Sequence, residues 1–124
     1  MIRLALIALL AGVGFAGCGD DGADALGVGA QCTMNDQCNQ ADGAQTCLPF
    51  KGGYCGLAGC LHDADCPEAS ACIMHDDGIN YCFHTCIDKA ECNRNRDVAN
   101  EANCSSSVTF VDGTMGRKAC VPPT

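Results

Sequence analysis

At 124 residues the chain has room for one compact domain or a short array of very small ones. It carries thirteen cysteines but no Trp, two Tyr and four Phe, so it can bury little apolar area and must rely on cross-links, which predicts an oxidising compartment. The formal net charge of −8 argues against nucleic acid as a partner and against electrostatic binding to an anionic membrane.

The first segment, residues 1–17, has the pattern of a signal peptide. Arg3 supplies the positive charge of a short n-region, and an unbroken apolar run follows from position 4 to position 13. That run is too short for a stable membrane span, which needs about 20 residues. The sequence therefore predicts export and removal of the leader.

The leader ends in Phe15-Ala16-Gly17-Cys18, which resembles the lipobox of bacterial lipoproteins. The resemblance implies that the Cys18 thiol is diacylglycerated and that the bond before it is then cleaved; Phe15 departs from the usual Leu at its position. Residues 14–16 also fit an ordinary signal-peptidase site, and a cut after Ala16 would leave a secreted soluble protein. Parity favours lipidation, because thirteen cysteines leave one unpaired and removing Cys18 leaves twelve.

The next segment is poor in bulky side chains. Residues 19–30 contain no cysteine and consist mainly of Gly, Ala and Asp. Together with the lipidated cysteine, this predicts a flexible tether over residues 18–31, with a span of about 20 Å for a random coil.

The remaining cysteines form a threefold repeat over residues 32–55, 60–82 and 86–120. The gap between the first and second cysteine is five residues in every unit, whereas the later gaps vary. Acidic side chains lie in each first gap. The twelve predicted disulfide cysteines are Cys32, Cys38, Cys47, Cys55, Cys60, Cys66, Cys72, Cys82, Cys86, Cys92, Cys104 and Cys120. The acidic residues are Asp36 in the first unit, Asp63 and Asp65 in the second, and Asp88 and Glu91 in the third.

A glycine turn between apolar or aromatic residues lies between the third and fourth cysteine of each unit. The turns are Lys51-Gly52-Gly53, Asp76-Asp77-Gly78 and Asp112-Gly113, and the last joins residues 108–111 to Thr114-Met115. Glycine supplies the positive φ that a tight hairpin requires. We therefore predict a small disulfide-rich fold of three short four-cysteine units, each with a β-hairpin and little other regular structure. Residues 97–102, in an insertion peculiar to the third unit, predict about one helical turn.

Four cysteines allow three pairings within a unit. We favour first-to-third and second-to-fourth, because pairing across the five-residue loop would leave the hairpin unanchored. An isolated two-stranded hairpin is marginal in water, so the disulfides must hold it.

This spacing resembles the cysteine-rich repeat of exported proteins and lipoproteins of myxobacteria, and it is similar to the N-terminal cysteine-rich region of Dickkopf proteins. The likeness covers residues 32–120. It implies an extracellular location and protein binding, and it carries no catalytic residues. The long final gaps of the third unit depart from the usual compact form.

A metal-binding alternative centres on the second unit. It would use residues that can ligate calcium or zinc: His62, Asp63, Asp65, His75, Asp76, Asp77 and His84. Against it, no Cys-x2-Cys pair occurs, exported thiols are expected to oxidise, and the aspartates also fit turns and caps. Ser105-Ser106-Ser107 has no histidine near it in sequence, so we expect no enzyme. We also expect no bound metal and no cofactor.

The sequence thus predicts a non-catalytic binding or structural module at the cell envelope. The lipid anchor at Cys18 would hold it to a membrane, with the outer membrane or cell surface favoured, and otherwise the protein would be secreted. The expected partner is another envelope or extracellular protein, and not nucleic acid. The aromatic side chains are either contact residues or core: Phe50, Tyr54, Tyr81, Phe83 and Phe110.

Overall fold

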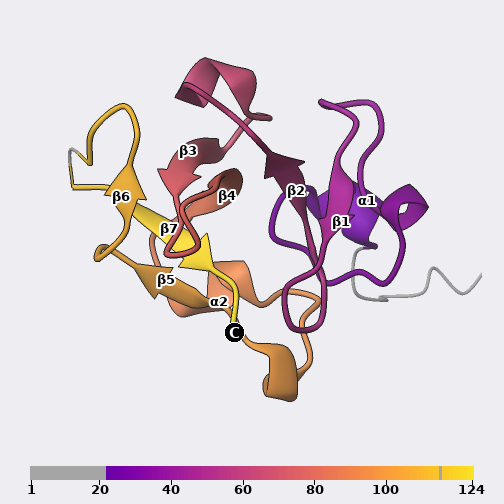
Figure 1. The fold of residues 1–124 in the computed structure, drawn as a ribbon. Helices are drawn as coiled ribbons and strands as arrows, with labels where there is room; N and C mark the ends of the chain where they lie inside the picture. The colour runs from indigo at the N-terminus through magenta and orange to yellow at the C-terminus, as the bar shows by residue number, and fades with distance from the viewer. Residues whose placement is uncertain (1–21, 115) are drawn as a thin grey trace, which may run out of the picture.

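The computed structural model describes residues 22–114 and 116–124, and its regular elements are short (Figure 1). The predicted signal peptide and Cys18 lie outside the described residues. The helical elements are α1 (Ala23–Leu26), α2 (Lys89–Cys92) and the 3-10 turns η1 (Asn35–Gln37), η2 (Asp63–Asp65) and η3 (Val98–Asn100). The strands are β1 (Thr46–Leu48), β2 (Tyr54–Ala58), β3 (Ser70–Met74), β4 (Asn80–Cys86), β5 (Asn103–Ser105), β6 (Thr109–Phe110) and β7 (Lys118–Val121).

These strands form one connected antiparallel sheet. Its main path runs β1-β2-β4-β3-β6, while β7 pairs with β4 and β5 pairs with β7. With six disulfides in the described residues, the predicted class of small disulfide-rich fold is confirmed. No helix among the described residues has the length and apolar character needed to cross a bilayer.

The disulfides pair first with third and second with fourth cysteine in every unit, as favoured from the sequence. The bonds are Cys32–Cys47, Cys38–Cys55, Cys60–Cys72, Cys66–Cys82, Cys86–Cys104 and Cys92–Cys120. The third and fourth cysteines stand directly opposite each other on paired strands in all three units, for example Cys72 opposite Cys82. Each bonds to the first loop rather than to its neighbour, so the two bonds clamp that loop onto the hairpin.

The hairpins of units one and two are confirmed. β1 and β2 are joined through Gly52 and Gly53, which have φ of 76° and 70°. A Cβ at Gly53 would collide with the carbonyl oxygen of Cys32, so this position requires glycine for space as well as for φ. β3 and β4 are joined by a turn in which Gly78 has φ of 80°.

For unit three, the sequence predicted the wrong strands for the hairpin. The Gly113 turn forms, with its N–H donating to the carbonyl of Phe110. However, β6 pairs with β3 of unit two, placing Phe110 opposite Ile73. The hairpin of unit three is made by β5 and β7, with Cys104 opposite Cys120. The long final gap lets the chain leave this hairpin and bury the Phe110 ring in the core shared with unit two, which a local turn signal cannot reveal.

The predicted flexible tether is also wrong from residue 22 onward. α1 precedes a segment in which Val28 and Ala30 are only 6% and 5% exposed. The Gly29 N–H donates to the carbonyl of Cys55 at 2.8 Å, and the Cys55 N–H donates to the carbonyl of Ala30 at 2.9 Å. Small side chains here reflect close packing against unit one rather than freedom of the chain.

The three units share one hydrophobic core. Tyr54 and Phe83 are fully buried, Tyr81 and Phe110 are 8% and 5% exposed, and Phe50 packs against this core. The rings of Tyr81 and Phe83 are stacked with centroids 5.7 Å apart. The core role for the aromatic residues is therefore confirmed, and the contact role is wrong for the four that are buried.

The insertion of unit three reaches back to unit one. The guanidinium of Arg96, which is 7% exposed, donates to carbonyls from three parts of the chain. Two of these acceptors are Gly29 at 3.2 Å and Gly53 at 2.8 Å. The predicted helical turn of this insertion is present as η3. Burial lowers the pKa of the Arg96 side chain.

The disulfide arrangement gives a direct chemical test. Alkylation of the unfolded, non-reduced protein should label none of the twelve cysteines of the three units, because each one is bonded. Peptide mapping by mass spectrometry should recover the six pairs given above. Two or more labelled cysteines among the twelve would contradict the pairing.

Candidate functional site

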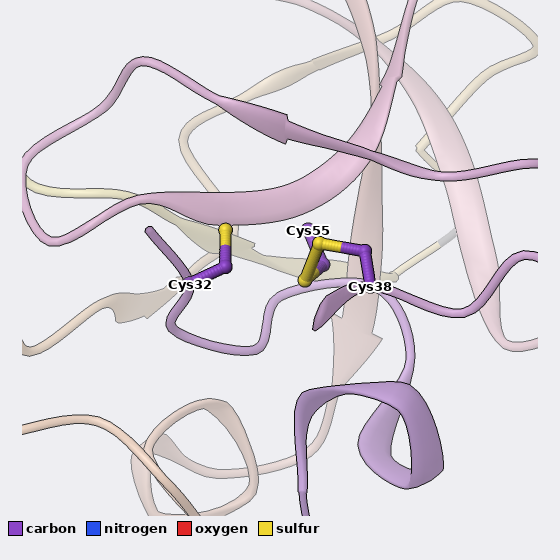
Figure 2. Close-up of side chains that lie close together, drawn as sticks. All are labelled: Cys32, Cys38 and Cys55. Atoms are coloured by element: carbon purple, nitrogen blue, oxygen red, sulfur yellow. A yellow bond between two sulfur atoms is a disulfide. The ribbon is translucent and has the colours of Figure 1, made fainter. Parts of the chain in front are cut away.

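The sulfur atoms of each unit gather into one compact cluster. Figure 2 shows Cys32 beside the disulfide of Cys38 and Cys55, and the three sulfur atoms lie within 4.8 Å of one another. The equivalent clusters are Cys60, Cys66 and Cys82, and Cys86, Cys92 and Cys120. The thiolate is the form of cysteine that ligates metals, so these bonded sulfur atoms act as cross-links.

The residue before each second cysteine accepts backbone N–H groups at the start of the first loop. In unit two, Asp65 Oδ2 accepts from the N–H groups of Leu61 and His62 at 2.9 and 3.0 Å. These hydrogen bonds lower the pKa of Asp65. Gln37 and Glu91 occupy the same position in the other units and accept in the same way. The repeated feature is thus an acceptor oxygen that caps a turn.

A second acceptor, two positions earlier, ties the loop to the hairpin. Asp63 Oδ1 accepts from the N–H of Cys72 at 2.9 Å, and Asn35 Oδ1 accepts from the N–H of Cys47 at 2.9 Å. Asp36, the acidic residue of the first unit, is exposed and fills neither position. In unit one the two acceptors are therefore amides, which a search for acidic residues misses.

His62 belongs to a network that joins units two and three. Its Nδ1 lies 2.9 Å from Asp112 Oδ1, and Asp112 Oδ2 accepts from the N–H of Asp63 at 2.7 Å. Arg117 donates to Asp63 Oδ2 at 2.8 Å and lies over the Phe110 ring, 4.5 Å from its centroid. Both carboxylate oxygens of Asp63 are thus occupied by protein donors.

The turn between β3 and β4 uses its aspartates locally. Asp77 Oδ1 accepts from the N–H of Ile79 at 2.9 Å, and Asp77 Oδ2 accepts from the hydroxyl of Tyr81 at 2.7 Å. Asp76 is exposed. This matches the turn interpretation of residues 76–78.

The residues of the metal-binding alternative are divided among these local structures. His75 packs edge-on against Phe50, with ring centroids 5.3 Å apart, and His84 lies half-buried near the end of β4. Within residues 22–114 and 116–124, groups of three or more candidate ligand atoms within 4.8 Å of one another come from cysteine alone. The structure therefore does not bring His62, His75 and His84 to one centre.

The two histidines His62 and His84 should titrate on opposite sides of the ordinary pKa of about 6.5. The hydrogen bond and charge of Asp112 raise the pKa of exposed His62, and burial lowers the pKa of His84. NMR titration of the imidazole C–H signals should show this order. The His62–Asp112 pair therefore stabilises the fold in the acidic range below about pH 6.5, and this contribution is lost as pH rises through the raised His62 pKa. It is also lost at still lower pH, as the pH falls through the lowered pKa of Asp112 and that carboxylate protonates.

The Asp112→Asn variant is the control for this titration. Removing the carboxylate charge should return the His62 midpoint toward its ordinary value and leave that of His84 where it was. An unchanged His62 midpoint in this variant would contradict the assigned pair.

A groove of about 700 Å³ lies where units two and three meet. Ser70 stands opposite His84, and Cys86 stands opposite Lys118, so alternate positions of β3, β4 and β7 turn these side chains to one face of the sheet. The other face carries the buried Phe83 and Ala119. The lining residues are Ala69, Ser70, His84, Thr85, Cys86, Ile87, Glu91, Gly116, Arg117 and Lys118.

The rim of this groove combines apolar, basic and acidic groups. Ile87 is 82% exposed and follows the half-buried Cys86. Ala69 adopts φ of 59°, and its carbonyl accepts from both the N–H and the hydroxyl of Thr85. Strained non-glycine backbone is often found at binding sites. No sequence signal marked this groove, because its walls come from two units.

Ser105 and Ser107 of the serine run line one pocket with His75 and Asp76 of unit two. Ser105 lies on β5 and its hydroxyl accepts from the N–H of Ser107 at 3.1 Å. Comparison with known proteins adds no functional assignment: no protein family, no curated protein and no solved structure matches the chain.

Proposed function

We propose that the chain is an exported lipoprotein, lipidated at Cys18, whose disulfide-built domain is a non-catalytic module that binds another envelope or extracellular protein. The observation that carries the binding role is the groove between units two and three, with Ile87 82% exposed on its rim. An apolar side chain this exposed beside a concave surface is suited to insertion into a partner.

The rigidity of the walls supports this role. The groove is bordered by paired strands and by the bond between Cys86 and Cys104, so its shape is set before a partner arrives. A preformed surface loses little conformational entropy on binding. The mixed lining, with Lys118 and Glu91 beside Ile87, favours a protein surface over a purely apolar ligand.

The lipid anchor is supported by the sequence around Cys18 and by cysteine parity, since the twelve other cysteines are all bonded. The expected result of fractionation is wild-type protein in the membrane pellet and the Cys18→Ser variant in the soluble fraction. Mass spectrometry of the wild-type N-terminus should find a lipid-modified cysteine. Soluble, unmodified wild-type protein would overturn the anchor.

The groove is tested with a photo-crosslinking amino acid placed at Ile87 in cells. We expect a discrete crosslinked product from this position. Val98 is the matched control, because it is 86% exposed and lies on η3, outside the groove lining. Equal crosslinking from both positions would argue against the groove as the binding surface.

The metal-dependent alternative makes a different prediction. Calcium or zinc would then raise the melting temperature of the oxidised protein, and a chelator would lower it. The binding-module proposal expects neither change, because Asp63, Asp65 and Asp77 already accept hydrogen bonds from the protein.

A further inference from the structure

We propose that the lipid anchor holds one particular face of the domain directly on the phospholipid headgroups. This anchor-proximal face surrounds Gly22 and comprises Ala23, Asp24, Gln31, Asp36, Gln37 and Asn95, which together with Gly22 line a shallow depression. It belongs to α1, to η1 and to the neighbouring loops. The inference rests on the proposed lipidation of Cys18 and adds a defined orientation to it.

The chain is fixed to the domain from Gly22 onward. The N–H groups of Ala25 and Leu26 donate to the carbonyl of Gly22, each at 3.0 Å, which starts α1 at this residue. Ala23 and Leu26 of α1 pack against the buried cysteine cluster of unit one. The following residues are held by the backbone bonds between Gly29, Ala30 and Cys55. The segment that the sequence suggests as a long tether is thus part of the folded domain.

Only residues 19–21 separate the lipidated cysteine from this fixed point. Four Cα–Cα steps span at most about 14 Å, even for fully extended chain. A lipidated Cys18 lies near the boundary of acyl chains and headgroups, and the headgroup layer is itself about 6 Å thick on each side. Gly22 can therefore rise at most about 8 Å above the headgroup layer, so the face around it is the part of the domain that can rest on the headgroups.

Proximity here comes from the covalent link rather than from charge. Asp24 and Asp36 lie on the anchor-proximal face, and the whole chain has a formal net charge of −8. Such a surface is not attracted to anionic lipid. Met34, next to η1 and 56% exposed, adds an apolar side chain beside this face. Figure 1 shows α1 and β6 on opposite sides of the domain, so β6 should point away from the bilayer.

The absence of Trp makes the test clean, because a single introduced Trp is then the only indole reporter. The Asp36→Trp variant places it on the anchor-proximal face, and the Thr109→Trp variant places it on β6; both positions are exposed. Each full-length lipidated protein is reconstituted in phosphatidylcholine vesicles whose acyl chains are brominated near the headgroups. We expect strong loss of fluorescence in the Asp36→Trp variant and little loss in the Thr109→Trp variant, relative to vesicles without bromine.

A longer linker is the second control. Inserting about twelve Gly and Ser residues between Asp21 and Gly22 adds an average reach of about 20 Å. The Asp36→Trp reporter should then recover its fluorescence while the protein stays in the vesicle fraction. Membrane-bound protein with equal, weak quenching at both reporter positions would overturn the orientation alone. Wild-type protein that never enters the membrane fraction would overturn the anchor and the orientation together.

Discussion

The Arg96→Ala variant should lose about 3 kcal/mol of its free energy of unfolding, because it leaves several carbonyls without their charged donor. Arg96 Nε donates to Asn100 at 2.7 Å, and Nη2 donates to Lys51 at 3.0 Å. Nη1 donates to the carbonyls of Gly29 and Gly53. One side chain thus connects the N-terminal segment, the turn of unit one and the insertion of unit three. Denaturant unfolding with the disulfides intact would measure the loss.

Two comparisons separate this role from a general effect of charge. The Arg94→Ala variant removes an exposed guanidinium from the same insertion and should change stability by no more than about 0.5 kcal/mol. The Arg96→Lys variant should recover only part of the loss, because a single ammonium cannot match the planar fork of donors. Equal stability of the Arg94→Ala and Arg96→Ala variants would show that Arg96 does not join the units.

The Tyr54→Phe variant should lose about 2 kcal/mol of its free energy of unfolding. The fully buried Tyr54 hydroxyl donates to the carbonyl of Cys120 at 2.8 Å and accepts from the N–H of His84 at 3.1 Å. It therefore links unit one to Cys120 of unit three and to His84, which follows unit two, and its removal takes a hydrogen-bond partner from both backbone groups. Burial also raises the pKa of this hydroxyl, so it stays protonated and able to donate.

The Tyr81→Phe variant is the matched control for Tyr54→Phe. The Tyr81 hydroxyl donates to Asp77, whose carboxylate lies at an exposed turn where water can replace the lost partner. We expect a loss of about 0.5–1 kcal/mol, by denaturant unfolding under the same conditions. A smaller effect for Tyr54→Phe than for Tyr81→Phe would contradict the bridging role of Tyr54.

The acidic residues of the first loops predicted correctly where a repeated loop lies, but they identified only part of the chemistry that holds it. Acidic residues before the second cysteine indicated a repeated loop, and Asp65 and Glu91 do cap its backbone. In unit one the capping group is the side-chain amide of Gln37, whereas Asp36 is exposed to solvent. The physical requirement is an acceptor oxygen, which carboxylates and amides both meet.

By itself the sequence determined the local features of this protein. Cysteine spacing and glycine turns predicted the class, two of the three hairpins and the favoured pairing, because disulfides and tight turns act over short stretches of chain. The tertiary structure decided what links distant residues: the docking of residues 22–30, the pairing of β6 with β3 and the burial of Arg96. It also formed the groove at His84 and Lys118 from two units. These contacts join residues far apart in sequence, and they depend on the shape that the cross-linked units present to one another.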